Sequence, residues 1–176
     1  ALALEPGYAK THKLLGLIDY RQGRTTDAIA RMEEARRLDP KDPEAKALFE
    51  RWKFEGAFTR TFRDTKEGRF LLRADPSLPA SRVGEIPRKL EAAWKDIGGA
   101  LGARGPRQLT VVLFTPAGFL KATRSYHWVG GVYDGQIKLP VPDGKTVDAQ
   151  AMRELDEAIR HEIAHAAIRE VCPECP

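Results

Sequence analysis

The segment 147–171 restricts the fold of this chain more than any other part of the sequence. Its apolar side chains recur at the three- and four-residue spacing of one helix face: Met152, Leu155, Ala158, Ile159, Ala166 and Ile168. Thr146 or Asp148 can cap the beginning of a helix here, and Pro173 ends it. The segment is therefore predicted to form one long helix.

An HExxH sequence, His161-Glu162-Ile163-Ala164-His165, lies within this predicted helix. Residues four apart share one face of a helix, so both imidazoles can point at one metal ion. Glu162 stands beside them, where it can polarise a water molecule on the metal. The positions between and just after the histidines are uncharged and small or apolar, as a buried metal helix requires. His161 and His165 are therefore candidate Zn²⁺ ligands, and Glu162 is the candidate catalytic residue.

A catalytic zinc ion usually takes three protein ligands and keeps one position for water. Glu157 lies one turn before His161, but it is about 12 Å along the helix axis from His165, so these three cannot surround one ion. The metzincin continuation is absent, because Val171 stands where that pattern has its third histidine. The third ligand is expected downstream of Pro176, and a chain with only two ligands is expected to bind zinc weakly or to lack it.

Cysteines near the end of the chain are another possible source of a metal ligand. They form the CxxC sequence Cys172-Pro173-Glu174-Cys175. A CxxC sequence can be half of a zinc site, a redox pair or a disulfide. There is no second CxxC, and no thioredoxin-like βαβ pattern surrounds this one. Cys172 as third zinc ligand would need a sharp turn after the helix, so a local disulfide or two free thiols is the simpler interpretation.

Length and charge limit the other functions open to the chain. Its 176 residues suffice for one domain plus a smaller module. The net charge is +4, but basic and acidic residues are mixed and no basic stripe with interleaved aromatics is present, so nucleic acid is not an expected partner. No apolar run reaches transmembrane length.

Both ends of the chain resemble cuts through a longer protein. An upstream signal peptide or anchor is therefore an open possibility, and so is a location in the bacterial envelope, the periplasm or the cytoplasm.

The first third of the chain has an internal period. Residues 4–6 (Leu-Glu-Pro) recur as residues 38–40 (Leu-Asp-Pro), a shift of 34 residues. Gly16 and Ala28 are small where paired helices would approach closely, and Gly23 allows a turn between helices. The pattern resembles the tetratricopeptide repeat, to which residues 1–56 are assigned, with a last helix over 43–54. The resemblance implies a surface for a protein partner or a scaffold; in the simpler interpretation Leu14, Leu15, Ile18 and Met32 are core.

The residues from 57 onward combine strand and helix patterns. The predicted elements are a hairpin of strands 59–63 and 69–73, a long helix over 77–101 in which Pro87 can cause a kink, a buried strand over 108–114, a helical turn over 116–121 and an edge strand over 132–141. Together with the helix over 147–171, they predict an α+β fold for residues 57–176.

This order of elements, with residues 131–140 leading into the HExxH helix, resembles the N-terminal lobe of the thermolysin-like zincins. It is most similar to the peptidase-MA-like gluzincin domains that bacterial proteins often fuse to tetratricopeptide repeats. The resemblance implies a zinc metallopeptidase in which His161 and His165 bind the metal and Glu162 is the general base. In such domains a glutamate on a following segment supplies the third ligand.

The resemblance also implies how a peptide or protein substrate is held. The edge strand would pair with an extended substrate, and its candidate substrate-binding residues are Val132, Tyr133, Gln136 and Ile137. Tyr126, His127 and Tyr133 are candidates to stabilise the oxyanion.

Two alternatives stand beside the peptidase. One is a non-catalytic tetratricopeptide scaffold whose degenerate zincin lobe binds peptides without cutting them. The other is zinc-dependent hydrolysis of a bond other than a peptide bond. Residues downstream of Pro176 would separate the first alternative from the peptidase, since a Glu-Gly pair one helix onward favours catalysis.

Overall fold

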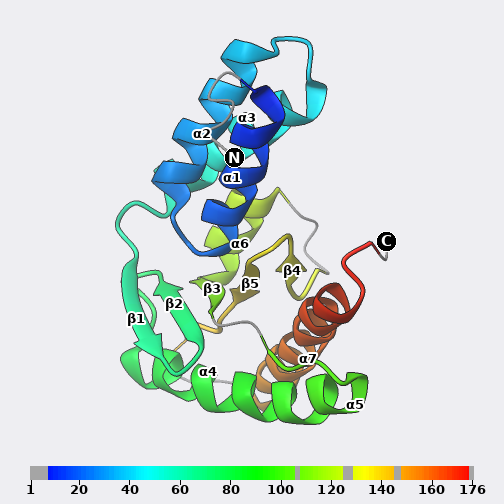
Figure 1. The fold of residues 1–176 in the computed structure, drawn as a ribbon. Helices are drawn as coiled ribbons and strands as arrows, with labels where there is room; N and C mark the ends of the chain where they lie inside the picture. The colour runs from blue at the N-terminus through cyan, green and yellow to red at the C-terminus, as the bar shows by residue number, and fades with distance from the viewer. Residues whose placement is uncertain (1–7, 106–107, 125–128, 145–147, 175–176) are drawn as a thin grey trace. The chain divides into compact units, whose positions relative to one another are not determined.

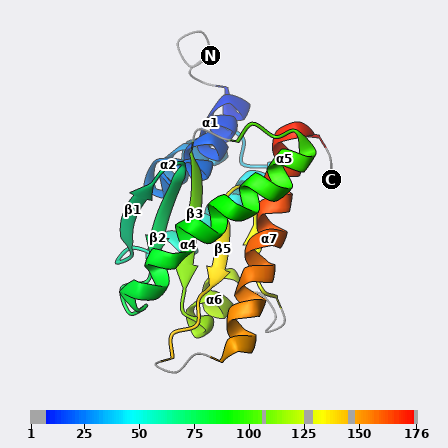
Figure 2. The same cartoon turned by 90° about the horizontal axis from the view of Figure 1, so that it is seen from below.

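The computed structural model describes residues 8–105, 108–124, 129–144 and 148–174. Figures 1 and 2 show the ribbon from two directions, and the chain divides into two compact units, Ala1–Arg60 and Thr61–Pro176. The fold class is α+β, with helices and a five-stranded mixed sheet. The boundary predicted after residue 56 is four residues early, because helix α3 (Pro43–Phe58) runs through that point. None of the described helices has the length and apolar character needed to cross a membrane.

The first unit is built from α1 (Ala9–Arg21), α2 (Thr25–Leu38) and α3. A Cβ atom at Gly16 would lie 3.3 Å from the carbonyl oxygen of Ala28, so the predicted close approach of α1 and α2 is confirmed. Gly23 turns the chain between them with φ of 77°. The buried apolar residues are Tyr20, Ala28, Met32, Ala35, Ala45, Phe49 and Trp52. Leu14 and Ile18 are about half exposed, so the interpretation of both as core is wrong.

The second unit contains the sheet, whose strand order is β1-β2-β3-β5-β4. The strands are β1 (Arg63–Glu67), β2 (Phe70–Ala74), β3 (Leu109–Phe114), β4 (Val132–Tyr133) and β5 (Ile137–Pro140). β3 pairs in parallel with β2 and β5, while β1 and β4 are antiparallel to their neighbours. Every residue of β3 is buried, which confirms the predicted buried strand.

The first hairpin lies later in the chain than predicted. β1 begins at Arg63, because α3 extends to Phe58 and Thr59 forms its C-terminal cap. β1 is polar and exposed along its whole length, so it has no alternating pattern that the sequence could display. Its pairing with β2 brings Arg73 beside Asp64, with an Nε–Oδ1 distance of 2.8 Å.

The predicted single strand over 132–141 is also corrected. Gly135, with φ of 105°, turns the chain between β4 and β5, so the segment is a short hairpin. β5 pairs with both β3 and β4 and is an interior strand, while β4 is the edge. The alternation itself is confirmed, because Ile137, Leu139 and Val141 all join the core.

The long helix after β2 is divided into three parts. It comprises α4 (Ala80–Ala93), a π-helical turn η1 (Trp94–Gly98) and α5 (Gly99–Leu101), and α4 continues through Pro87. A Cβ atom at Gly98 would lie 2.9 Å from Nε1 of Trp94, so glycine leaves room for the indole ring. Ile86, Leu90 and Ala93 of α4 are buried against the sheet.

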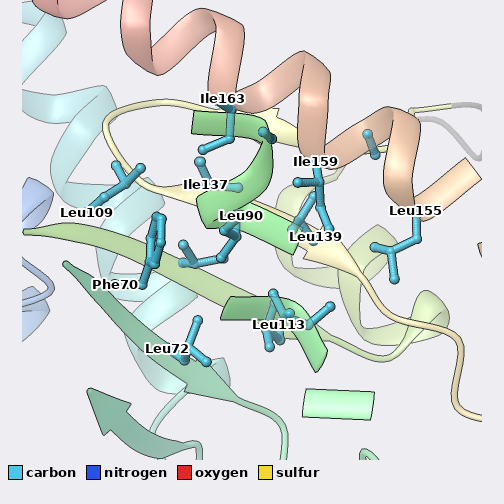
Figure 3. Packing of buried hydrophobic residues seen from close by; sticks show 14 of the residues in the cluster. Phe70, Leu72, Leu90, Leu109, Leu113, Ile137, Leu139, Leu155, Ile159 and Ile163 are labelled. Carbon is cyan, nitrogen blue, oxygen red and sulfur yellow. The ribbon is translucent and has the colours of Figure 1, made fainter. Parts of the chain in front are cut away.

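Helix α7 (Ala149–Val171) matches the predicted helix closely, and the carboxylate of Asp148 caps it by accepting a hydrogen bond from the N–H of Gln150. Figure 3 shows Leu155, Ile159 and Ile163 pointing from α7 toward the core side chains of the sheet. α6 (Pro116–Thr123) lies at the other face, where Phe119 contacts Phe114 of β3. The apolar face of α7 is therefore fixed against the sheet.

Candidate metal centre

His161 and His165 lie on the exposed side of α7, one helical turn apart. Their Nε2 atoms are 3.0 Å apart, and the two rings are inclined at 82°. Two nitrogen atoms that bind one zinc ion at 2.0–2.1 Å with tetrahedral angles lie about 3.3 Å from each other. The two imidazoles therefore already converge as a pair of ligands to one ion would.

Glu162 is almost completely buried, with 3% of its surface exposed. A Cβ atom on Gly131 would lie 2.8 Å from Cγ of Glu162 and 2.9 Å from its Oε1, so only a glycine allows this packing. Burial raises the pKa of the Glu162 carboxyl group to about 7. Within the described ranges, no hydrogen bond or ion pair satisfies this carboxylate. A buried carboxyl group with a pKa near neutrality is suited to accept and release a proton.

A pocket of about 950 Å³ opens beside these residues. Its lining includes His161 and Glu162, and it extends along α7 toward Ala151 and the segment 140–144. The other walls are formed by α6 and by Val129, Gly130 and Gly131, which precede β4. This volume is typical of small-molecule and peptide side-chain sites.

The residues predicted to bind substrate do not all lie at the sheet edge. Val132 and Tyr133 form β4, the edge strand, and are half-buried. Gln136 is buried in the turn and Ile137 is fully buried in β5, so a substrate strand pairing with β4 cannot use their positions. The prediction treated 132–141 as one strand, whereas the turn at Gly135 separates Gln136 and Ile137 from β4. Tyr126 and His127, the predicted oxyanion residues, lie outside the described residues.

A buried ion pair holds the β4–β5 hairpin. Nζ of Lys138 lies 2.8 Å from Oδ2 of Asp134, and Lys138 is 3% exposed. The N–H of Asp134 also donates to the carbonyl of Gln136 across the turn. A buried charge without its partner is costly, so the pair favours the tight turn that separates edge strand from interior strand.

A third ligand for a metal is not found in the part of the chain that the structure describes. Among the described residues, no group of three or more His, Cys, Asp or Glu side chains is placed to hold one metal ion. Cys172 is disulfide-bonded, so its thiol is not free to bind zinc. Glu170 instead accepts hydrogen bonds from the N–H groups of Arg104 and Gly105. Of the residues described, His161 and His165 are therefore the two candidate ligands.

The sequence prediction did not identify the glycine pair before β4 or the acidic lining of the pocket. Gly130 and Gly131 let the chain before β4 approach α7 closely, and two adjacent glycines before a strand are a signal that could have indicated this approach. Asp143, Glu154 and Glu157 line the pocket, but they come from two separate segments, and their proximity depends on the tertiary fold.

Comparison with known proteins adds no further assignment to this geometry: neither a protein-family model nor a curated protein sequence matches the chain.

Proposed function

We propose that the chain is part of a zinc-dependent metallopeptidase, in which the second unit is a zincin-like lobe and the first unit is a tetratricopeptide-like module for a protein partner. The observation that carries the proposal is the arrangement on α7. Two imidazole nitrogens converge to 3.0 Å beside a buried glutamate, and His161 and Glu162 line a pocket of about 950 Å³.

In this proposal His161 and His165 hold the metal through their Nε2 atoms. Zinc bound there would supply a nucleophile at neutral pH, by lowering the pKa of water, and would polarise the scissile carbonyl group. Glu162 accepts the proton of the attacking water and transfers it to the leaving amine. Its raised pKa supports both halves of this role, because the carboxyl group can exist in either protonation state near pH 7.

The edge strand supports the binding of an extended chain. Among the described strands, β4 pairs only with β5, so its outer backbone groups can pair with a peptide. Gly130 and Gly131 bring the beginning of this strand to within van der Waals distance of α7 at Ala158 and Glu162. A peptide lying along β4 would therefore pass close to the candidate general base.

The test combines metal binding with hydrolysis. Zinc is added to the purified chain, and cleavage of a mixture of fluorescence-quenched peptides is followed with and without a chelator. With zinc in excess over the weak affinity expected of two histidine ligands, we expect chelator-sensitive cleavage that is lost in Glu162→Gln while zinc affinity is retained. Cleavage at the wild-type rate by Glu162→Gln would overturn the mechanism, and zinc-independent peptide binding without cleavage would favour the scaffold.

A further inference from the structure

The pocket beside His161 has a distinct charge. The carboxyl groups of Asp143, Glu154, Glu157 and Glu162 line it, and no lysine or arginine does so among the described lining residues. The chain as a whole has the opposite balance, with 29 basic and 25 acidic residues. The negative charge of the pocket is therefore local to this site.

Most of these carboxylates lack a compensating group. Within residues 8–105, 108–124, 129–144 and 148–174, no ion pair or hydrogen bond occupies the side chains of Asp143 and Glu157, and Glu154 accepts only from the neutral amide of Gln150, at 2.8 Å. Glu162 is an independent indication of a ligand, because it is 3% exposed, faces the pocket and has no described partner. Buried or crowded carboxylates without partners favour the binding of a cation.

The other walls of the pocket are apolar. Phe119 and Leu120 of α6 form one side, and Leu155 and Ala158 of α7 form another. Lysine and arginine side chains combine a long aliphatic stem with a cationic tip, so they match a pocket with apolar walls and acidic groups. A hydrated metal ion would use the carboxylates but not these apolar walls.

We propose that this pocket selects substrates with a cationic ammonium or guanidinium group close to the bond that is cut. The aliphatic stem packs against Phe119, Leu120 and Ala158, and the cation lies beside Glu154 and Glu157. The identity of the pocket as a substrate site rests on the proposed function, and the cation preference extends it. Two sources supply the same chemistry: a lysine or arginine side chain, or the amino terminus of the peptide.

The experiment measures binding to the metal-free chain by calorimetry, so that hydrolysis is not required. Three pentapeptides of alanine are compared: one blocked at both ends with central lysine, one blocked with central norleucine, and one with central norleucine and a free amino terminus. We expect a cationic peptide to bind about tenfold more tightly than the blocked norleucine peptide. The tighter of the two cationic peptides identifies the source of the cation.

Charge removal in the pocket provides the second arm. The double variant Glu154→Gln and Glu157→Gln should remove the roughly tenfold preference, because the cation then lacks the two carboxylates beside it. The variant should fold, because both positions are exposed and do not contribute to the core. The matched control is Glu67→Gln in β1, an exposed carboxylate at the opposite edge of the sheet, which should leave the preference unchanged.

The inference would be overturned if all three peptides bound equally, or if none of them bound. A preference that survives the double substitution would also overturn it. Since no zinc is present, a cation preference can be found in a chain that never cleaves peptides. That result would contradict the proposed function and leave the pocket's selectivity standing.

Discussion

The two faces of α7 contrast sharply, although they belong to one helix. Leu155, Ile159 and Ile163 are buried against the sheet, whereas His161 and His165 are exposed, each two residues away from Ile163 in the sequence. The buried face determines where the helix lies, and the exposed face presents the candidate ligands. The contrast shows how a site gains rigidity: its ligands stand on an element whose position is fixed by core packing.

Glu162 lies at the boundary between these faces. It is as buried as its apolar neighbours, yet it carries a carboxyl group whose pKa burial raises to about 7. It also contacts Gly131 in the segment that leads into the edge strand. The residue proposed as general base thus packs like a core residue, while its carboxyl group lies beside the candidate ligand His161 in the pocket lining.

The largest expected effect comes from removing the Glu162 carboxylate. Glu162→Gln should lower the rate of zinc-dependent peptide hydrolysis by roughly 10²–10⁴-fold, because the amide cannot accept the proton of the attacking water. Zinc affinity measured by calorimetry should stay within about twofold, since the proposed ligands are His161 and His165. A comparable loss of zinc affinity would show that Glu162 acts on the metal.

One substitution on each face of α7 separates the effect on stability from the effect on metal binding. Ile163→Ala should lower the free energy of unfolding by about 2–5 kcal/mol, because it leaves a cavity in the core. His161→Ala, two residues earlier on the exposed face, should change it by less than about 0.5 kcal/mol. Urea denaturation of the metal-free protein measures both. Equal losses would contradict the division of α7 into a structural and a ligand face.

The pH dependence of the free energy of unfolding tests whether the carboxyl group of Glu162 is buried. Its carboxyl pKa is 4.5 in the unfolded chain and about 7 in the folded one, so the folded state binds more protons between these values. Burial of the charged carboxylate then destabilises the fold increasingly as pH rises through this window. Relative to wild type, metal-free Glu162→Gln should gain about 2–3 kcal/mol from pH 4.5 to pH 7.5. A difference that is constant with pH would contradict the assigned burial.

A small effect, confined to stability, is expected at the start of the helix. Asp148→Ala removes the cap on the N–H of Gln150, where the oxygen–nitrogen distance is 2.9 Å. It should cost about 1 kcal/mol in thermal or urea unfolding and leave the zinc affinity of the exposed face unchanged. Weaker zinc binding in this variant would mean that the helix end and the ligand pair are coupled.

The sequence predicted the parts of this molecule that depend on local pattern. The helical period around Leu155 and Ile159 and the apolar run of β3 each reveal one element without help from the rest of the chain. The HExxH spacing likewise placed His161 and His165 on one face, and the structure brings their Nε2 atoms to 3.0 Å.

Other features depend on contacts that a local pattern does not display. β1 is exposed throughout and exists through its pairing with β2, so its boundaries were misplaced. The Asp134-Gly135 turn was overlooked within a longer alternation, which put Ile137 at an edge that belongs to β4. The burial of Glu162 under Gly131 joins segments about thirty residues apart and follows only from tertiary packing.

The most direct test of the central claim, that His161 and His165 share one metal ion, is calorimetric titration of zinc into the wild-type chain, His161→Ala and His165→Ala. We predict one ion per wild-type chain, and for each variant an affinity reduced by more than the 10–100-fold that loss of an outer-sphere partner costs. Zinc binding of the same strength and stoichiometry in all three proteins would contradict the metal centre.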